Sequence, residues 1–261
     1  MSQLTYGTYL HLDELLQLQK PRSEPEEHDE LLFIVVHQAY ELWFKLMLHE
    51  LEKVRTDFFE GRLWPAISTF KRIRNIMKVL VEQVDIVETL TPMSFNSFRD
   101  RLDTASGFQS FQFREVEFLL GYKRGDMRQY HAAGSGAREG LEKRLSEPSV
   151  VDAFYVFLQK HGVEIPNELL KRDLSQATQP NETVQQGILR LYKTKPDMEV
   201  LFELMTDLDE GFQEWRYRHI KVVERTIGSK KGTGGSLGVE FLKKSLFLSV
   251  FPDLWAIRHE L

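Results

Sequence analysis

Hydrophobic residues recur at steps of three and four along most of the chain, which is the spacing that places them on one face of an α-helix. The longest stretches of this kind run from Leu31 until Gly61, from Pro65 until Thr91-Pro92, and from Pro196 until Gly228. Proline fits the first turn of a helix and glycine commonly follows the last turn, so both residue types mark the expected ends. The pattern therefore predicts long helices packed in a bundle.

Shorter helices are expected around these three. One spans Tyr6 to Gln19 and stops before Pro21, because proline is not tolerated in a helix interior. Residues 94–122 predict a short helix, a break at Ser106-Gly107, and then a second helix that is rich in phenylalanine.

The remaining segments are divided by small residues and prolines. Residues 121–140 are small and polar, which indicates a connection, and prolines separate shorter helices within residues 139–192. The loop from Ser229 to Gly238 is the most glycine-dense part of the chain, and a last helix is expected to end near Phe251-Pro252.

The fold class that follows is all-α, because no convincing set of alternating strand patterns bounded by turns is present. A chain of 261 residues can bury the core of one large domain, and we expect a single domain over residues 1–261. Within it, residues 123–192 are predicted to form a helical insertion beside the main bundle.

The composition indicates which broad class of protein this is. With 42% hydrophobic and 28% charged residues, the chain has the composition of an ordinary globular protein. No uninterrupted apolar run reaches the roughly 18 residues that a spanning helix needs, and residues 1–20 do not have the pattern of a signal peptide. We therefore expect a cytoplasmic protein with no membrane partner.

A formal net charge of −5 argues against a general nucleic-acid partner. Basic residues do gather near the end of the third long stretch, and we interpret them as a solvated face at a helix end. They are Arg216, Arg218, Lys221, Arg225, Lys230 and Lys231.

The chain contains no cysteine. This excludes disulfides, thiolate metal sites, iron–sulfur clusters, cysteine nucleophiles, thiolate-ligated haem and covalently attached haem. Any metal must therefore be held by His, Asp, Glu or Tyr.

Two of the eight histidines, His37 and His219, lie in the middle of predicted helices among apolar neighbours. Phe33 precedes the first by one turn, and Trp215 precedes the second by one turn. Neutral imidazole is the usual protein ligand of b-type haem, and bundle helices commonly seat cofactors. A hydrogen-bonded core histidine is the alternative interpretation of each residue.

Other metal sites fit less well. A carboxylate di-iron bundle needs Glu three residues before His on two helices, and no histidine of this chain has that neighbour. The triplet His28-Asp29-Glu30 is interpreted as a charged helix start, because acidic residues are favourable in a first turn.

Two further features suit anions. The glycine-dense loop holds lysines and Thr233, which would allow it to surround a carboxylate or a phosphate, although the phosphate-loop pattern is absent and a flexible loop is the alternative. Arg99 could form a two-pronged contact with a carboxylate, and an ordinary surface arginine is the alternative there.

Taken together, five blocks in a fixed order resemble the tryptophan 2,3-dioxygenase family over residues 4–260. The blocks are Leu4-Thr5-Tyr6-Gly7 through Leu10; His28-Asp29-Glu30 with Phe33, His37-Gln38 and Glu41-Leu42-Trp43; Phe98-Arg99-Asp100; Ser106-Gly107-Phe108-Gln109-Ser110; and Trp215-Arg216 through His219 with Lys231-Gly232-Thr233-Gly234-Gly235.

The resemblance implies a reaction and a cofactor. It implies that the chain opens the indole ring of L-tryptophan with O₂ at haem b, giving N-formyl-L-kynurenine in the first step of the kynurenine pathway. One haem per subunit is implied, with Fe(II) as the active form.

The resemblance also implies roles for particular residues. His219 matches the axial ligand of the haem iron, and His37 matches the distal histidine that meets the indole N–H. The other matching positions would contact the substrate or the haem propionate: they are Phe33 beside the indole ring, Arg99 and Thr233 at the carboxylate and ammonium, and the turn at Ser106 and Gly107.

The family's quaternary structure is implied as well. Residues 1–20, with Tyr6, Tyr9 and Leu10, match an N-terminal segment that reaches into a neighbouring subunit's active site, which implies a homotetramer. This chain has Phe95 where some bacterial members have a tyrosine near the substrate carboxylate, and the missing hydrogen bond is expected to weaken substrate binding by about 1 kcal/mol.

Three other functions stay open at this point. One is an oxygenase on the same scaffold that inserts a single oxygen atom into a tryptophan derivative. Another is a haem or tryptophan sensor in which His37 is a second axial ligand. The third is a helical adaptor whose histidines belong to the core.

Overall fold

The computed structural model of the chain describes residues 4–230, 232 and 238–261. Helices make up its regular structure, and the described residues contain no strand, which confirms the all-α fold class. The α-helices in chain order are α1 (Tyr6–Leu10), α2 (Leu12–Leu15), α3 (His28–Glu60), α4 (Leu63–Val87), α5 (Pro92–Arg99), α6 (Phe111–Leu119), α7 (Gly136–Ser146), α8 (Val150–Lys160), α9 (Asn167–Leu170), α10 (Glu182–Thr194), α11 (Pro196–Ile227), α12 (Val239–Lys243) and α13 (Pro252–Ala256).

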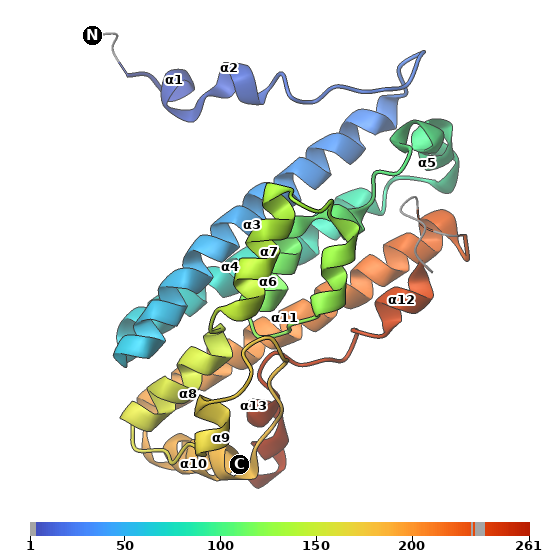
Figure 1. The fold of residues 1–261 in the computed structure, drawn as a ribbon. Coiled ribbons are helices and arrows are strands. Elements are labelled where there is room, and N and C mark those ends of the chain that lie inside the picture. The colour runs from blue at the N-terminus through green and yellow to red at the C-terminus, as the bar shows by residue number, and fades with distance from the viewer. Residues whose placement is uncertain (1–3, 231, 233–237) are drawn as a thin grey trace.

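Three long helices, α3, α4 and α11, form the main bundle (Figure 1). They are the three that the hydrophobic periodicity predicts, and Gly61 ends α3 with a positive φ of 75°, a conformation that glycine adopts without strain. Helix α4 packs against both of the others. A Cβ atom at Gly211 of α11 would lie 2.8 Å from Cγ of Met77 on α4, so a glycine is required for their close approach.

The core of the bundle consists of fully buried aliphatic and aromatic side chains. They come from several helices and include Met47, Leu51 and Phe58 on α3, Phe70 and Ile73 on α4, Tyr155 and Phe157 on α8, and Phe202 and Phe212 on α11. Removing apolar side chains from water is the main favourable contribution to folding. The same core also includes side chains of α8 and α10.

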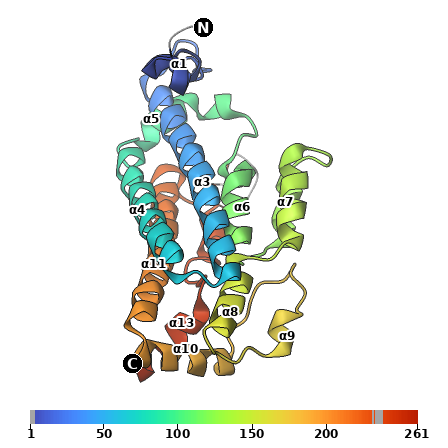
Figure 2. The same ribbon diagram turned by 90° about the vertical axis from the view of Figure 1, so that its left-hand side faces the viewer.

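Shorter helices cover two sides of the bundle (Figures 1 and 2). Helix α6 lies beside α3, and α7 packs on the outer side of α6. Helices α8, α9, α10 and α13 gather at the end of the bundle away from the N-terminal segment. Residues 123–192, expected as an insertion, thus supply buried residues to the main core, and their separation from the bundle as a unit stays a prediction.

Three segments differ from the sequence-based expectation. The single helix expected from Tyr6 to Gln19 is two short helices, because His11 takes a left-handed conformation with φ of 52° between α1 and α2. Residues 121–140 are not merely a connection, since they hold the 3₁₀ helix Gly125–Tyr130 and the start of α7.

The expected last helix is also wrong. It is divided into α12 and α13, and Pro252 begins the second of these rather than following its end. A proline fits the first turn of a helix as well as the position beyond its end, so the residue alone did not distinguish the two cases.

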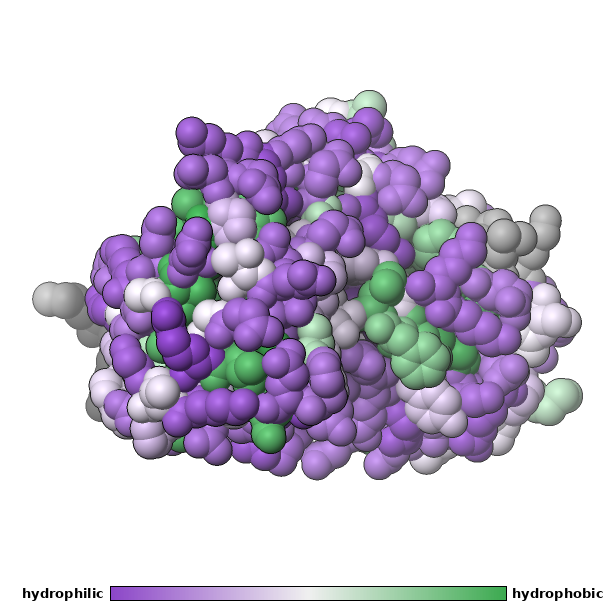
Figure 3. All heavy atoms as spheres, turned by 90° about the horizontal axis from the view of Figure 1, so that it is seen from below, coloured by the Kyte–Doolittle hydropathy of each residue, from purple (hydrophilic) through white to green (hydrophobic). Residues whose placement is uncertain are grey.

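Helix α3 is long and apolar enough to cross a membrane by length and composition alone. Part of that apolar surface faces a large cavity, described below, through residues such as Phe33 and Phe44. The expectation of no membrane partner stays a prediction. The face seen from below is mostly hydrophilic, with hydrophobic atoms in separate patches (Figure 3).

Candidate functional site

A cavity of about 570 Å³ opens between α3, α5, α6 and α11. This volume lies in the range of small-molecule and cofactor sites, which are commonly apolar with a few polar groups. Aromatic and imidazole rings make up much of its lining, and they include Phe33, His37, Phe44, Phe113, Trp215 and His219.

His219 reaches the cavity from the middle of α11. The protein surrounds its ring, and burial, followed by the nearby His37 and Arg114, lowers the pKa of His219 to about 4. The imidazole is therefore neutral near pH 7, which is the form that ligates a metal. Trp215, one turn earlier, stacks on it with the two ring centroids 5.2 Å apart and the planes 8° from parallel.

His37 faces the same cavity from α3. Burial lowers its pKa, although water reaches the ring through the open cavity. Its Nδ1 lies 2.6 Å from the carbonyl oxygen of Phe33, and a carbonyl only accepts, so Nδ1 carries the proton. The other ring nitrogen, Nε2, is consequently a hydrogen-bond acceptor.

Phe33 belongs to a small aromatic cluster at this end of the cavity. Its ring centroid is 4.0 Å from that of His37, 5.8 Å from that of Phe95 and 5.6 Å from that of Phe98. Phe95 and Phe98 lie on α5 and are buried. The cluster therefore joins α3 to α5 and gives the cavity an apolar, aromatic wall.

The break at Ser106-Gly107 is part of the cavity lining. The hydroxyl of Ser106 caps the short 3₁₀ helix Gly107–Gln109, and its backbone N–H donates to the side chain of Gln109. Capping groups of this kind fix the path of the chain, so the expected turn is present and lies against the cavity.

Arg99, at the end of α5, also lines the cavity. Of the glycine-dense loop, Gly232 lines it as well, whereas Thr233 lies outside the described residues. The described structure thus brings together His37, His219 and Arg99, three of the residues singled out in the sequence.

Tyr6, Tyr9 and Leu10 do not lie at the cavity of their own chain. Their side chains are 76%, 68% and 40% exposed, and neither α1 nor α2 contains a buried residue. In Figure 1 this segment runs across the end of the bundle at the start of α3.

Four charged residues line the cavity together, which was not expected from the sequence: Arg114, Glu117, Arg124 and Arg216. Arg216 was expected on a solvated face and is instead only 5% exposed, because the carboxylate of Glu117 and the carbonyl of Leu248 lie beside it. The signal was present in α6, where Arg114 and Glu117 stand one turn apart among apolar residues.

The other basic residues of this stretch differ in their partners and exposure. Arg218 forms ion pairs with Asp85 and Glu88, whereas Lys221 pairs with Glu224 on the exposed side of α11. His28-Asp29-Glu30 does begin α3, as expected, and Glu30 accepts hydrogen bonds from the backbone of Arg22 and Ser23.

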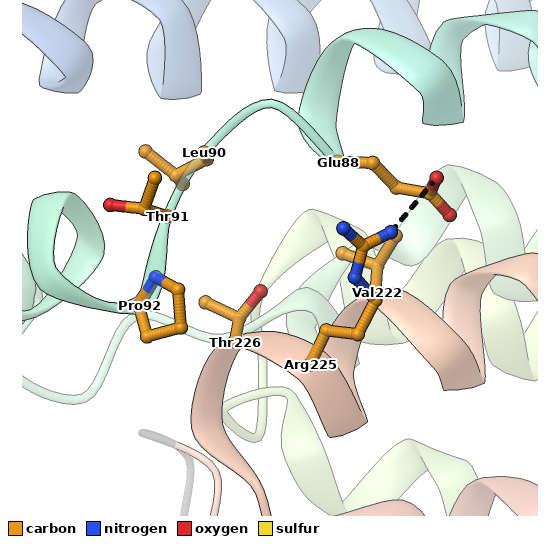
Figure 4. Close-up of a pocket in the computed structure, with 7 residues that line it drawn as sticks. All are labelled: Glu88, Leu90, Thr91, Pro92, Val222, Arg225 and Thr226. Carbon is orange, nitrogen blue, oxygen red and sulfur yellow. Dashed lines mark ion pairs between the residues drawn. The ribbon is translucent and has the colours of Figure 1, made fainter.

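A second, smaller cavity of about 130 Å³ lies next to the first, between α4, α5 and α11. Figure 4 shows its residues, with Arg225 directed at Glu88, and their charged groups are 3.2 Å apart. Leu90, Val222 and Thr226 line both cavities, so the two share a wall.

The arrangement limits what kind of metal site is available. Among the described residues, no group of three His, Asp or Glu side chains could hold a bare metal ion. A neutral histidine facing a largely apolar cavity suits a planar metal-containing cofactor such as haem, which brings its own equatorial ligands.

Comparisons with known proteins match the whole chain to one family. The sequence model of the family described as tryptophan 2,3-dioxygenase matches residues 1–195 and 188–261. A tryptophan 2,3-dioxygenase of Herpetosiphon aurantiacus is 52% identical over all of both chains. Proteins of the same name from Anaeromyxobacter sp. and Saccharopolyspora erythraea are 47% and 45% identical; they cover 98% and 99% of this chain, and the matches span 95% and 93% of their own lengths.

Proposed function

This chain belongs to the tryptophan 2,3-dioxygenase family, and we propose that it cleaves the indole C2–C3 bond of L-tryptophan with O₂ to give N-formyl-L-kynurenine. The reaction is the first step of tryptophan degradation by the kynurenine pathway. The observation that carries the proposal is one cavity that holds a neutral His219, a second histidine with an acceptor nitrogen, and Arg99.

We propose haem b as the cofactor, one per chain, with Fe(II) as the active form. The residues fit such a group because His219 is neutral and the cavity around it is lined by Phe44, Phe113 and other apolar side chains. When bound, ferrous haem supplies the iron that activates O₂. His219 would hold its iron, and Trp215, stacked on the imidazole, would restrict the rotation of that ring.

His37 would hold the indole N–H of the substrate. Its Nε2 accepts a hydrogen bond because the proton stays on Nδ1, where the carbonyl of Phe33 accepts it. This contact orients the indole ring without taking its proton, so His37 is a positioning group rather than an essential base. The ring of Phe33, beside that of His37, would form the apolar wall next to the indole.

Arg99 would hold the substrate carboxylate. A guanidinium and a carboxylate form a charge-assisted pair that selects free amino acids over neutral indoles. The turn at Ser106 and Gly107 borders the same cavity, and Thr233 is proposed to join Arg99 at the amino acid group. Phe95 offers no hydroxyl at this wall, which is expected to weaken binding by about 1 kcal/mol.

The experiment that tests the function is a labelled turnover. The reduced, haem-loaded protein is given L-tryptophan and ¹⁸O₂, and the mass of the product is measured. We expect N-formylkynurenine with two labelled oxygen atoms. A product with one labelled atom would identify a monooxygenase. No product despite bound haem would identify a sensor. Failure to bind haem would favour a helical adaptor whose histidines belong to the core.

We further propose a homotetramer in which the N-terminal segment of one subunit completes the site of another, and a cytoplasmic location. The exposed side chains of Tyr6, Tyr9 and Leu10 support the tetramer. Helices as short as α1 and α2 are not stable alone in water, so packing against a second copy of the chain would account for them.

Replacing Tyr6, Tyr9 and Leu10 together by serine is expected to reduce turnover at least tenfold and to dissociate the tetramer. Analytical ultracentrifugation and steady-state kinetics check this. Trp64→Ser is the control, because Trp64 is also a large exposed side chain, 63% exposed. It lies at the start of α4, near the end of α3 that is far from the N-terminal segment. A triple variant that stays tetrameric and fully active would contradict the proposal.

A further inference from the structure

A buried cluster of charged side chains forms part of the cavity wall beside α6 and α11. We call Arg114, Glu117, Arg124 and Arg216 the arginine cluster. Glu117 is at its centre and accepts from Arg114; its two carboxylate oxygens lie 2.9 and 3.2 Å from the same nitrogen of Arg124. A nitrogen of Arg216 lies 3.7 Å from Glu117 as well. One carboxylate thus faces three guanidinium groups.

The charges of the cluster do not cancel. Three positive groups and one negative group leave two positive charges, and Glu117 is the only carboxylate that forms an ion pair with any of the three arginines in the described part of the chain. Asp126, which is exposed, acts on Arg124 only at longer range.

The excess charge lies where it is costly. Arg114, Arg216 and Glu117 are 6%, 5% and 2% exposed. A buried charge is costly unless it is paired. Burial, followed by the nearby Arg124 and Arg216, lowers the pKa of Arg114 despite its pairing with Glu117. A role limited to joining α6 to α11 would need one arginine for one carboxylate, not three.

Several donors of the cluster also lack partners. The Nε atoms of Arg114, Arg124 and Arg216 are buried, and none has a hydrogen-bond partner among the described residues. Tyr122 packs against two of the guanidinium groups: those of Arg124 and Arg216 lie 4.9 and 5.3 Å from the centre of its ring. Unpaired buried donors in a cavity wall indicate an acceptor that the polypeptide does not supply.

We propose that the arginine cluster binds the propionate carboxylates of the haem, and this inference rests on the haem binding proposed above. Haem carries two carboxylates on an otherwise apolar ring, so its two negative charges match the two positive charges left in the cluster. Guanidinium groups form strong charge-assisted hydrogen bonds with carboxylates in a dry environment. The cluster thus recognises the cofactor, whereas Arg99, on α5, is the residue proposed above for the substrate carboxylate.

The proposal predicts a specific difference between two probes. Apoprotein is titrated with haemin and with haemin dimethyl ester, which has the same ring without the negative charges, and binding is followed by the Soret absorption. We expect the unmodified chain to bind haemin at least tenfold more tightly than the ester.

The variant of choice is Arg124→Gln, because the side chain of Arg124 is 20% exposed and tolerates change better than Arg114 at 7%. We expect it to reduce the preference for haemin at least threefold while ester binding stays unchanged, which also shows that the variant is folded. Arg128→Gln is the matched control, since Arg128 lies four residues later, in the 3₁₀ helix that follows Arg124, and does not line the cavity.

Two results would overturn the inference. Equal affinity of the unmodified chain for haemin and its ester would show that the cluster does not recognise carboxylates. An equal loss of both affinities in Arg124→Gln would give Arg124 a structural role only. If the unmodified chain binds neither probe, the haem proposal itself fails, and this inference fails with it.

Discussion

Replacing His219 by glycine is expected to abolish tryptophan cleavage, with kcat at least a thousandfold lower, and to weaken haem binding. The reason is that His219 is the neutral imidazole proposed to ligate the iron, and glycine offers no side chain to take its place. Steady-state kinetics and the Soret spectrum check both effects. Added imidazole is expected to restore part of the haem spectrum and of the turnover, because it fits the space that the side chain leaves.

His37→Gly is the matched comparison, since both histidines face the same cavity from different helices. It is expected to keep the haem and the axial-ligand spectrum and to lose roughly ten- to a hundredfold in turnover, as for a group that orients the indole N–H. Complete loss of turnover in His37→Gly with intact haem and substrate binding would contradict a positioning role and make His37 an essential base. A His219→Gly protein with unchanged haem spectrum would remove His219 from the iron.

Arg99→Ala is expected to raise KM for L-tryptophan strongly, corresponding to about 2–4 kcal/mol of binding. The loss comes from the charge-assisted pair with the substrate carboxylate. Binding of indole derivatives without a carboxylate, such as tryptamine, is therefore expected to change little. The measurement is the dissociation constant of both ligands, together with KM for L-tryptophan.

Arg101→Ala provides the control for this prediction. Arg101 lies two residues further along the chain, is exposed and does not line the cavity. It is expected to leave both ligands unaffected. If Arg99→Ala weakens L-tryptophan and tryptamine equally, the guanidinium supports the structure of α5 rather than the substrate.

The sequence determined the long helices of this protein because their signals are local. A step of three or four residues between apolar positions requires no knowledge of distant partners, and Gly61 needs only its own left-handed conformation to end α3. The same holds for His37 and His219, since an imidazole in the middle of an apolar helix face is recognisable from its immediate neighbours.

Only the tertiary structure decided which residues share a wall and which charges are buried. Arg216 looks like its exposed neighbour Lys221 in the sequence, and its burial depends on Glu117, which α6 supplies from a distant part of the chain. Likewise, no residue in the sequence clearly predicts the left-handed break at His11 or the separation of α12 from α13. A side chain's charge is a property of the sequence, but its energetic cost depends on the partners that folding brings to it.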